Sequence, residues 1–564
     1  MSAVTEASPF DTAAVTLDGE NGGRPAVQIW GMRGMVVAMH PVAAQVALDV
    51  LRAGGNAFDA GIALSAALAV VSPDWAGVAG DSAWLLHDAA RAEFHHLDGY
   101  STCPQRMTPA SLVAHFGLDA RRVPCAFREE PPSERATGVP TSMIPGTPAS
   151  WDALSRKLCT LPIRELLAPA VRLAKVGFVV NRYLAESFRL SETKLRAHAS
   201  SRAEFCAEDG ALPKEGSVLV QKDLGETLEE LAECGIDTFY RGSIAEQIVA
   251  YAKDHGGFMS SADLSGFRPV WRGVHRGPYR GVDVVVTGPP TAGLHLLQAL
   301  AILERCDLHA MGYHSPAALH YLIESTKRAL AERRKLGGDP EHVMQNPAEL
   351  LAPSRIDMLC SSIRSAEATS VSDVQSLGAS TSHFVVCDAV GNLVSATQSL
   401  GSRFGCGDMV ARTGLMMNDR SWWMSLGDGP NVVAPGRRAS IGHAPAILCE
   451  EGKPIAALGS PGGFGILQYM TQAIVNMRDY GFDVQDAIEA PRFRLEGLGR
   501  RVWVERRIKQ ETRAALEGMG HEVVEYPAWT DRMGGVAGLE IDRRTGAILG
   551  GYDARRNSMA VGLD

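Results

Sequence analysis

The chain has 564 residues, of which 46% are hydrophobic and 21% charged, and this composition excludes disordered and collagen-like proteins. Its net charge of −9 at pH 7, with no basic block in the sequence, argues against a nucleic-acid partner. The longest apolar stretch, residues 57–71, is too short to cross a bilayer, and residues 1–28 lack the basic and apolar regions of a signal peptide. We therefore expect no membrane partner and a cytoplasmic location.

The first half of the chain predicts helices and strands after a loose N-terminal segment, residues 1–30. Apolar residues at helical spacing predict helices over residues 41–53, 57–71, 151–157, 163–176, 223–233, 244–254, 293–304 and 317–334. Short apolar runs predict strands over residues 35–39, 83–87, 94–97 and 282–287. Residues 116–140 are rich in proline, arginine and glutamate and predict a surface loop.

The clearest β pattern lies in the second half. Residues 381–388 and 393–399 alternate in polarity around a Gly–Asn turn and predict a hairpin. The polar, serine-rich residues 367–379 before it predict a mobile linker. A strand at 455–457, a glycine turn at 460–463 and a helix at 466–480 follow. Together these elements favour sheet layers covered by helices.

Thr381 follows the linker and begins the first hairpin strand. A threonine hydroxyl is a poor nucleophile unless a base lies beside it, and an α-amino group on the same residue can be that base. Such an amine, with a pKa of about 7.7–8.0, exists only if the bond between Ser380 and Thr381 is cut. From the local sequence alone, an ordinary strand residue is the favoured interpretation.

The second candidate is the turn Ser460–Pro461–Gly462–Gly463, which lies between a strand and a helix. Backbone N–H groups of Gly462 and Gly463 can point freely at an oxyanion. Taken alone, such a turn is more often only a connection. It lacks the lysine of a phosphate-binding loop, and no Gly-x-Ser-x-Gly elbow supports a serine hydrolase. The ten scattered cysteines and sixteen histidines suggest reduced thiols and no metal site.

Several sequence blocks in one order resemble the γ-glutamyltranspeptidase family of N-terminal nucleophile hydrolases. The similarity extends from about residue 35 to residue 562. It is carried by GMVVAMHPVAAQVALDVLRAGGNAFDAGIALSAALAVVSP, PGTPASWDAL, LLAPAVRLAKVGFVV, GPPTAGLHLLQALAILE, STSHFVVCDAVGNLVSATQSLGSRFG, SPGG and DAIEAPRF. Each block is modest, but their combination is specific and reverses the interpretation of Thr381 as an ordinary strand residue.

The resemblance implies an α/β, four-layer αββα sandwich and a precursor that cleaves itself between Ser380 and Thr381. Residues 31–380 would form the large subunit and residues 381–564 the small one, within a single αββα body. Thr381 would be the nucleophile, Gly462 and Gly463 would form the oxyanion hole, and Ser399 would contact the nucleophile's amine. The resemblance implies no cofactor; the expected partners are a small-molecule amide or acyl substrate, the chain's own cleaved subunits and, as a further option, additional copies of the chain.

The sequence departs from the family where the family binds the glutamyl group. Tyr100 stands at the position of the family's glutamyl-binding arginine, and Trp423 at that of its acidic anchor. Ile441 and Gly442 match the family's paired serines. Each lost charge-assisted contact weakens binding by about 1.5–3 kcal/mol, which makes ordinary γ-glutamyl selectivity doubtful. Candidate replacements for the binding set are Tyr100, Asn418, Arg420, Trp423 and His383, with core packing the favoured role of His383.

Three functional hypotheses remain open at this stage. The first is a threonine hydrolase that cleaves a non-glutamyl amide, with hydrolysis of a carbon–carbon bond, as in alkylproline pathways, as a variant of the same chemistry. The second is a γ-glutamyl hydrolase or transferase with a rearranged pocket. The third, which Thr381, Ser399 and the glycine pair disfavour, is a non-catalytic scaffold.

Overall fold

The computed structural model describes residues 27–118, 137–371, 380–495 and 497–564. Most of the predicted loose N-terminal segment, most of the predicted loop at 116–140 and most of the predicted linker at 367–379 therefore lie outside the described residues. The N-terminal prediction needs one correction, because Ile29–Gly31 forms strand β1 and pairs with β20 (Ile548–Gly551). Backbone pairing with a distant strand is not visible in local composition.

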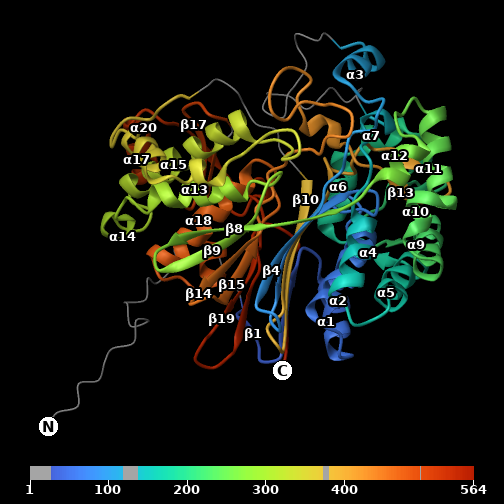
Figure 1. The fold of residues 1–564 in the computed structure, drawn as a ribbon, viewed down its shortest axis with the longest axis horizontal. Coiled ribbons are helices and arrows are strands. Elements are labelled where there is room, and N and C mark those ends of the chain that lie inside the picture. Colours follow the sequence, from blue (N-terminus) through green and yellow to red (C-terminus); the bar gives the residue numbers. More distant parts are fainter. Residues whose placement is uncertain (1–26, 119–136, 372–379, 496) are drawn as a thin grey trace.

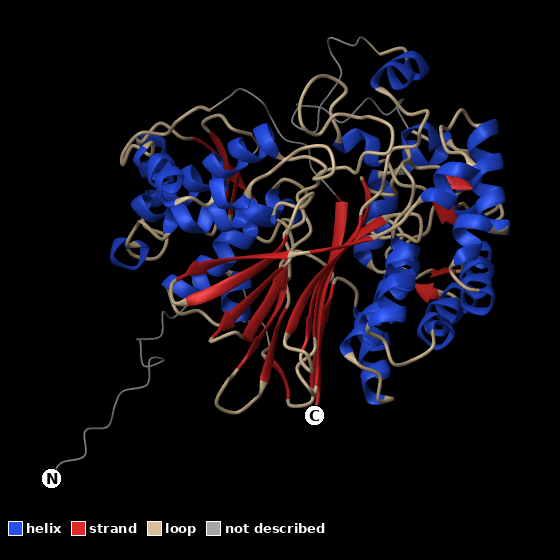
Figure 2. Ribbon diagram, in the orientation of Figure 1, coloured by secondary structure: helices blue, strands red, loops and turns tan. Residues whose placement is uncertain are grey.

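Two seven-stranded sheets form the centre of the molecule (Figure 2). The first sheet has the order β21 (Met559–Leu563), β2 (Gly34–Ala38), β10 (Ser380–Asp388), β11 (Leu393–Gly401), β3 (Asp81–Asp88), β4 (Glu93–Gly99) and β7 (Val270–Arg272). The second has the order β1, β20, β19 (Ala537–Ile541), β15 (Lys453–Gly459), β14 (Ala446–Glu450), β9 (Val282–Thr287) and β8 (Val274–Tyr279). All neighbouring strands in both sheets are antiparallel.

The two sheets pack face to face and each carries helices on its outer face (Figure 1). Helices α1 (Pro41–Arg52), α2 (Ala57–Val71), α4 (Thr147–Lys157) and α5 (Ile163–Val176) lie on the side of the first sheet, at the right of the view. Helices α13 (Gly293–Leu303), α15 (Pro316–Leu336), α18 (Gly465–Asp479) and α19 (Val484–Glu489) lie on the side of the second. The fold is the four-layer αββα sandwich that the sequence predicts.

Strand β10 shows how the layers are held together. Val385 points into the apolar layer between the sheets, while Phe384 and Val386 point into the cluster formed with the helices of the first sheet. Alternate side chains of a strand point to opposite faces, so a strand covered on both sides must be apolar on both. Hence the predicted hairpin strand is a central strand, hydrogen-bonded to β2 on one side and β11 on the other.

The strongest helix prediction is confirmed at both ends. Helix α2 spans Ala57–Val71 and is buried along its whole length. Asn56 and Asp59 form a capping box at its start, which satisfies N–H groups that the first turn leaves unpaired. The side chain of Asp388, at the end of β10, accepts a hydrogen bond from Ala57 N at 2.9 Å. The hairpin and the core helix are therefore joined by one buried carboxylate.

Sequence reasoning missed the short elements. They include helices α6 (Arg182–Leu190), α7 (Glu192–Ala197), α8 (Ala199–Phe205) and α10 (Asp237–Arg241), and strands β17 (Arg501–Glu505) and β18 (Glu522–Tyr526). Elements of this length contain one or two turns of helix or a few strand residues, too few to show a period. Among the described residues, no helix is long and apolar enough to span a membrane.

The double burial of β10 predicts a large cost for removing an aromatic ring from it. Phe384 is fully buried and its ring meets that of Trp84 edge-on at 5.4 Å. We expect Phe384→Ala to lower the free energy of unfolding by about 3–5 kcal/mol, measured from the urea midpoint. Val390→Ala, at an exposed turn position, is the control and should change it by less than about 0.5 kcal/mol. Equal effects of the two changes would contradict the assignment of β10 to the core.

Candidate active site

Thr381 lies at an irregularity in the strand ladder. Ser382 pairs with Gln398, whereas the backbone of Ser380 pairs with Gly401, so Ser399 and Leu400 together oppose Thr381. Such a bulge bends the strand and re-aims a side chain, and bulges occur often beside active sites. The Thr381 Oγ1 and Ser399 Oγ atoms are 3.5 Å apart, and both residues are buried.

The glycine turn follows β15, which packs against β10. The ring of His383 fills the space beside Gly459, where a Cβ atom would come within 2.0 Å of the ring. Gly459 is the last residue of β15, and Ser460–Gly463 follow it directly, while Thr381 is two residues before His383. The turn and Thr381 therefore lie at the same end of the paired sheets. Gly462 and Gly463 have φ of +124° and +57°, which other residues rarely adopt.

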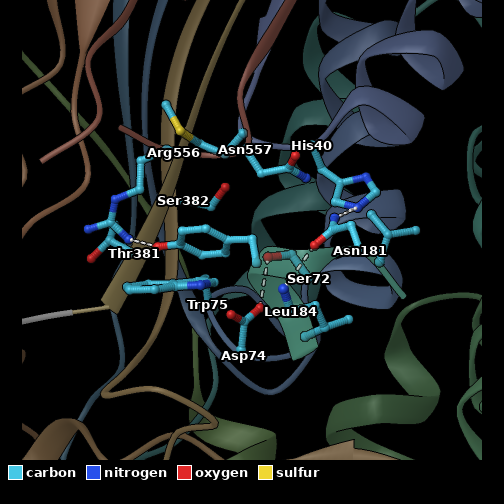
Figure 3. A pocket seen from close by; sticks show the side chains of 13 residues that line it. His40, Ser72, Asp74, Trp75, Asn181, Leu184, Thr381, Ser382, Arg556 and Asn557 are labelled. Atoms are coloured by element: carbon cyan, nitrogen blue, oxygen red, sulfur yellow. Dashed lines mark hydrogen bonds between the residues drawn. The ribbon is translucent and has the colours of Figure 1, made fainter. Parts of the chain in front are cut away.

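A small cavity lies beside Thr381 (Figure 3). Its volume of about 20 Å³ gives room for about one or two water molecules. The lining residues come from both sides of the predicted cleavage point: Met39, His40, Val71, Ser72, Asp74, Trp75, Asn181, Tyr183, Leu184, Thr381, Ser382, Arg556 and Asn557. In Figure 3, Arg556 and Trp75 lie on the side of Thr381, and His40 and Asn181 at the opposite end.

The cavity wall next to Thr381 is cationic and aromatic. The Arg556 guanidinium donates to the Tyr183 hydroxyl at 2.6 Å and lies 4.3 Å from the centre of the Trp75 ring. Burial raises the pKa of Tyr183 to about 12, so the phenol is neutral at pH 7. Sequence analysis singled out neither Tyr183 nor Arg556. No motif marks them, because they reach this place from a short helix and from the C-terminal segment.

The lining also contains two titratable groups whose pKa burial shifts towards the neutral form. Burial raises the pKa of Asp74, whose Oδ1 accepts from Ser72 Oγ at 3.0 Å while Oδ2 has no hydrogen-bond partner in the described structure. Burial lowers the pKa of His40 to about 4, and its ring contacts Asn181 at 3.1 Å. The cavity is therefore lined by the Arg556 guanidinium, by Asp74, whose carboxyl has a raised pKa, and by His40, which is neutral at pH 7.

Two of the predicted substrate-binding residues, Asn418 and His383, are hydrogen-bonded to other parts of the protein. The Asn418 amide donates to the carbonyl oxygens of Ala79 and Met143, at 2.9 and 2.8 Å, and accepts from Met143 N. The His383 ring contacts Thr397 Oγ1 at 2.9 Å and Ser395 Oγ at 3.3 Å, and burial lowers its pKa to about 3. These hydrogen bonds are typical of side chains that position backbone, and neither residue lines the cavity beside Thr381.

The other three predicted contacts are buried in a second polar region that is not part of the cavity. Arg420 pairs with Asp81, and both are at most 1% exposed. Burial raises the pKa of Asp81, and the charge of Arg420 opposes that rise. The Tyr100 hydroxyl and the Trp423 indole N–H have no hydrogen-bond partner among the described residues. A Cβ atom on Gly401 would lie 3.1 Å from that indole nitrogen, and Gly401 N donates to Ser399 Oγ, so this region adjoins Thr381 as well.

Comparison with known proteins agrees with this architecture. A solved cephalosporin acylase from Bacillus halodurans superposes with a TM-score of 0.88 at 28% identity, over 98% of this chain and 100% of that chain. The fold is thus that of an N-terminal nucleophile hydrolase. The chain is also 32% identical over 542 residues to the glutathione hydrolase proenzyme of Escherichia coli (strain K12), covering 93% of this chain and 90% of that protein.

A further relative is the acylase ACY 1 proenzyme of Pseudomonas sp. (strain V22), 33% identical over 539 residues, with 94% of this chain and 95% of that protein covered. The family model for γ-glutamyltranspeptidase matches residues 43–563. The chain therefore belongs to the γ-glutamyltranspeptidase family, whose members named here are hydrolases and acylases made as proenzymes.

The buried pair of Arg420 and Asp81 gives a pH-dependent prediction. Arg420→Met leaves the Asp81 carboxylate buried without its cation, and we expect the free energy of unfolding near pH 8 to fall by about 3–5 kcal/mol. Burial raises the pKa of folded Asp81 above the unfolded value of about 3.9, so the folded variant binds a proton more readily than the unfolded chain. The loss should therefore shrink as the pH falls and grow as the pH rises through the folded pKa.

The measurement is the urea midpoint at about pH 5 and about pH 8. The double variant Asp81→Asn/Arg420→Met carries no charge at either position and is the control. The difference in free energy of unfolding between the single and the double variant should be larger at the higher pH. If this difference does not depend on pH, Asp81 does not titrate as described.

Proposed function

We propose that this protein is a self-processing N-terminal threonine hydrolase that forms an acyl-enzyme from a small-molecule amide and passes the acyl group to water. The observation that carries the proposal is the place of Thr381, at the start of a central strand and opposite a bulge in β11, 3.5 Å from a second hydroxyl. Membership of a family of proenzymes supports it.

In the processing step, the Thr381 hydroxyl attacks the carbonyl carbon of Ser380. The acyl group moves from nitrogen to oxygen, and water then hydrolyses the ester, which leaves a carboxylate on Ser380 and a free amine on Thr381. Cleavage yields pieces of 380 and 564 − 380 = 184 residues, about 40 and 20 kDa of the total 60.3 kDa. Each sheet contains strands from both pieces, which supports a cleaved protein that stays one αββα body.

In the hydrolytic step, the same hydroxyl attacks the substrate amide while the Thr381 amine accepts its proton. The backbone N–H groups of Gly462 and Gly463 would bind the oxyanion, and Ser399 would orient the amine. The leaving amine takes up the proton, and a water molecule activated by the Thr381 amine then hydrolyses the ester. The water-sized cavity beside Thr381 supports water as the acceptor.

Selectivity for γ-glutamyl groups is not part of the proposal. Tyr100 and Trp423 replace charged groups that would bind the amino-acid head of a glutamyl substrate, and Asn418 is engaged by backbone. Hydrolysis of γ-glutamyl-p-nitroanilide faster than that of simple acyl anilides would instead favour a glutamyl enzyme with a rearranged pocket.

The processing step predicts the outcome of a gel experiment. Purified protein should give two bands of about 40 and 20 kDa, and Thr381→Ala should give one band of full length because it lacks the attacking hydroxyl. Thr381→Ser keeps a hydroxyl and should still be cut. Ser382→Ala removes the neighbouring hydroxyl and serves as the matched control, with cleavage expected. If Ser382→Ala stays uncut and Thr381→Ala is cut, the assignment of the nucleophile to Thr381 is wrong.

The proposed base predicts the pH dependence of turnover. The Thr381 amine acts only when unprotonated, and its reference pKa is about 7.7–8.0. We expect kcat/KM for an acyl anilide to rise tenfold per pH unit below this pKa and to level off above it. The guanidinium of Arg556 lines the same cavity and should move the midpoint downward. A value of kcat/KM that does not change between pH 5 and pH 9 would contradict an amine base.

A further inference from the structure

Two cysteines that are 54 residues apart in the sequence meet in the fold (360 − 306 = 54). Cys306 follows α13 and is a buried member of the apolar core on that side of the molecule, and it is 8% exposed. Cys360 lies on α17 (Pro353–Ser361), is partly exposed and packs against the same core. The Cys306 thiol is in hydrogen-bond contact with the Cys360 thiol. No spacing motif in the sequence marks this pair.

An ion pair joins the same two chain segments. Helix α17 lies beside α13 and α15 (Figure 1). Arg305, directly before Cys306, donates to Asp357 Oδ1 at 2.8 Å. Asp357 is three residues before Cys360, and side chains three residues apart on a helix share one face. The face of α17 that carries Cys360 is therefore turned toward Cys306, independently of the contact between the thiols.

The surroundings of the two thiols disfavour charge. Ile302, Ile356 and Leu359 form a buried apolar cluster, and Cys360 packs against it. Burial raises the pKa of the Cys306 thiol to about 12, and the neighbouring Cys360 adds to the rise, because two thiolates side by side repel each other. A disulfide carries no charge, so it suits this environment better than a pair of thiolates.

Other cysteines of the chain contact groups that cannot form a disulfide. The Cys103 thiol donates to Met424 Sδ at 3.6 Å, and the Cys387 thiol donates to the carbonyl oxygen of Asp388 at 3.5 Å. Cys234 is exposed at the end of α9 (Lys222–Cys234) and gives an accessible thiol for comparison.

We propose that Cys306 and Cys360 are a redox-sensitive dithiol that low-molecular-weight disulfides oxidise to an intramolecular disulfide. The thiolate of Cys360, the more exposed of the two, attacks one sulfur of the small disulfide, whose S–S bond breaks and releases one thiolate. The Cys306 thiolate then attacks the Cys360 sulfur, forms the Cys306–Cys360 bond and releases the second thiolate. Both protein thiols are oxidised, the small disulfide is reduced to two thiols, and these take up the two protons that the protein loses.

The new bond would fix α17 at the start of the segment that leads to the proposed cleavage point. Arg328 on α15 donates to both the hydroxyl and the carbonyl oxygen of Ser362, at 2.6 Å each, and Lys327 donates to the carbonyl oxygen of Thr369 at 2.6 Å. The disulfide adds a covalent connection directly before these contacts. A cross-link over 54 residues also removes conformations from the unfolded chain, which stabilises the folded protein.

The test is disulfide mapping of the purified full chain, cut or uncut. The protein is incubated at pH 8 with 2-hydroxyethyl disulfide or with dithiothreitol, alkylated in urea and digested with trypsin. Trypsin places Cys306 and Cys360 on separate peptides, residues 306–327 and 356–364. We expect these peptides to be joined after oxidation and separate after reduction. Their absence as a joined pair after oxidation, or a stable mixed disulfide on Cys360 in its place, would overturn the inference.

Variants assign a stability change to this bond. Oxidation should raise the melting temperature of the wild-type protein by about 2–4 °C. It should leave the melting temperatures of Cys306→Ala and Cys360→Ala unchanged, with the fold of each variant checked by circular dichroism. Cys234→Ala removes an accessible thiol elsewhere and is the matched control, with the wild-type shift expected. An equal shift in the wild type and in Cys306→Ala would overturn the proposed cross-link.

The inference does not depend on the proposed function of Thr381. Neither self-cleavage nor turnover enters the disulfide mapping or the melting temperatures. If the protein neither cuts itself nor hydrolyses an anilide, the proposed function is wrong and the mapping still decides the disulfide. If it does both and the joined peptides are absent, the disulfide is wrong and the threonine hydrolase stands.

Discussion

The arrangement of the site depends on one constraint, the pairing of β10 on both edges and its burial on both faces. β2 and β11 take the hydrogen bonds of β10, while apolar residues fill the layers above and below. A strand held in this way cannot slide without breaking two ladders and exposing alternate side chains to the wrong face. The register of the ladder with β11 shifts at Thr381, at the start of the strand. The proposed nucleophile therefore lies where a strand held on both edges becomes irregular.

The same constraint divides the surroundings of Thr381 into two regions of different chemistry. On one side, Tyr183 and Arg556 border a cavity of water size. On the other, the Arg420–Asp81 pair and Trp423 are buried in the second polar region, next to Gly401.

Prediction from sequence worked where a local rule has a single physical outcome. The continuous apolar run of residues 57–71 and the Gly–Asn turn after Asp388 each leave the backbone little choice, and the corresponding helix and hairpin are confirmed. It worked less well for the candidate substrate contacts. Asn418 and His383 are polar residues near a motif, yet the structure uses their hydrogen bonds to hold backbone and strand hydroxyls. Polarity alone does not show which partner a side chain will find.

The sequence by itself determined the buried helix over residues 57–71, the hairpin of residues 381–399 and the position of a threonine at its start, because hydrophobic periodicity and turn residues act over a few neighbouring residues. The order of the four layers followed from the resemblance to the family. Only the tertiary structure decided which distant groups meet Thr381. Tyr183 comes from a helix 198 residues earlier and Arg556 from a segment 175 residues later (381 − 183 = 198 and 556 − 381 = 175), and both line the cavity beside Thr381. Neither has a local signature, since a side chain looks the same in sequence whether packing buries it beside Thr381 or leaves it on the surface.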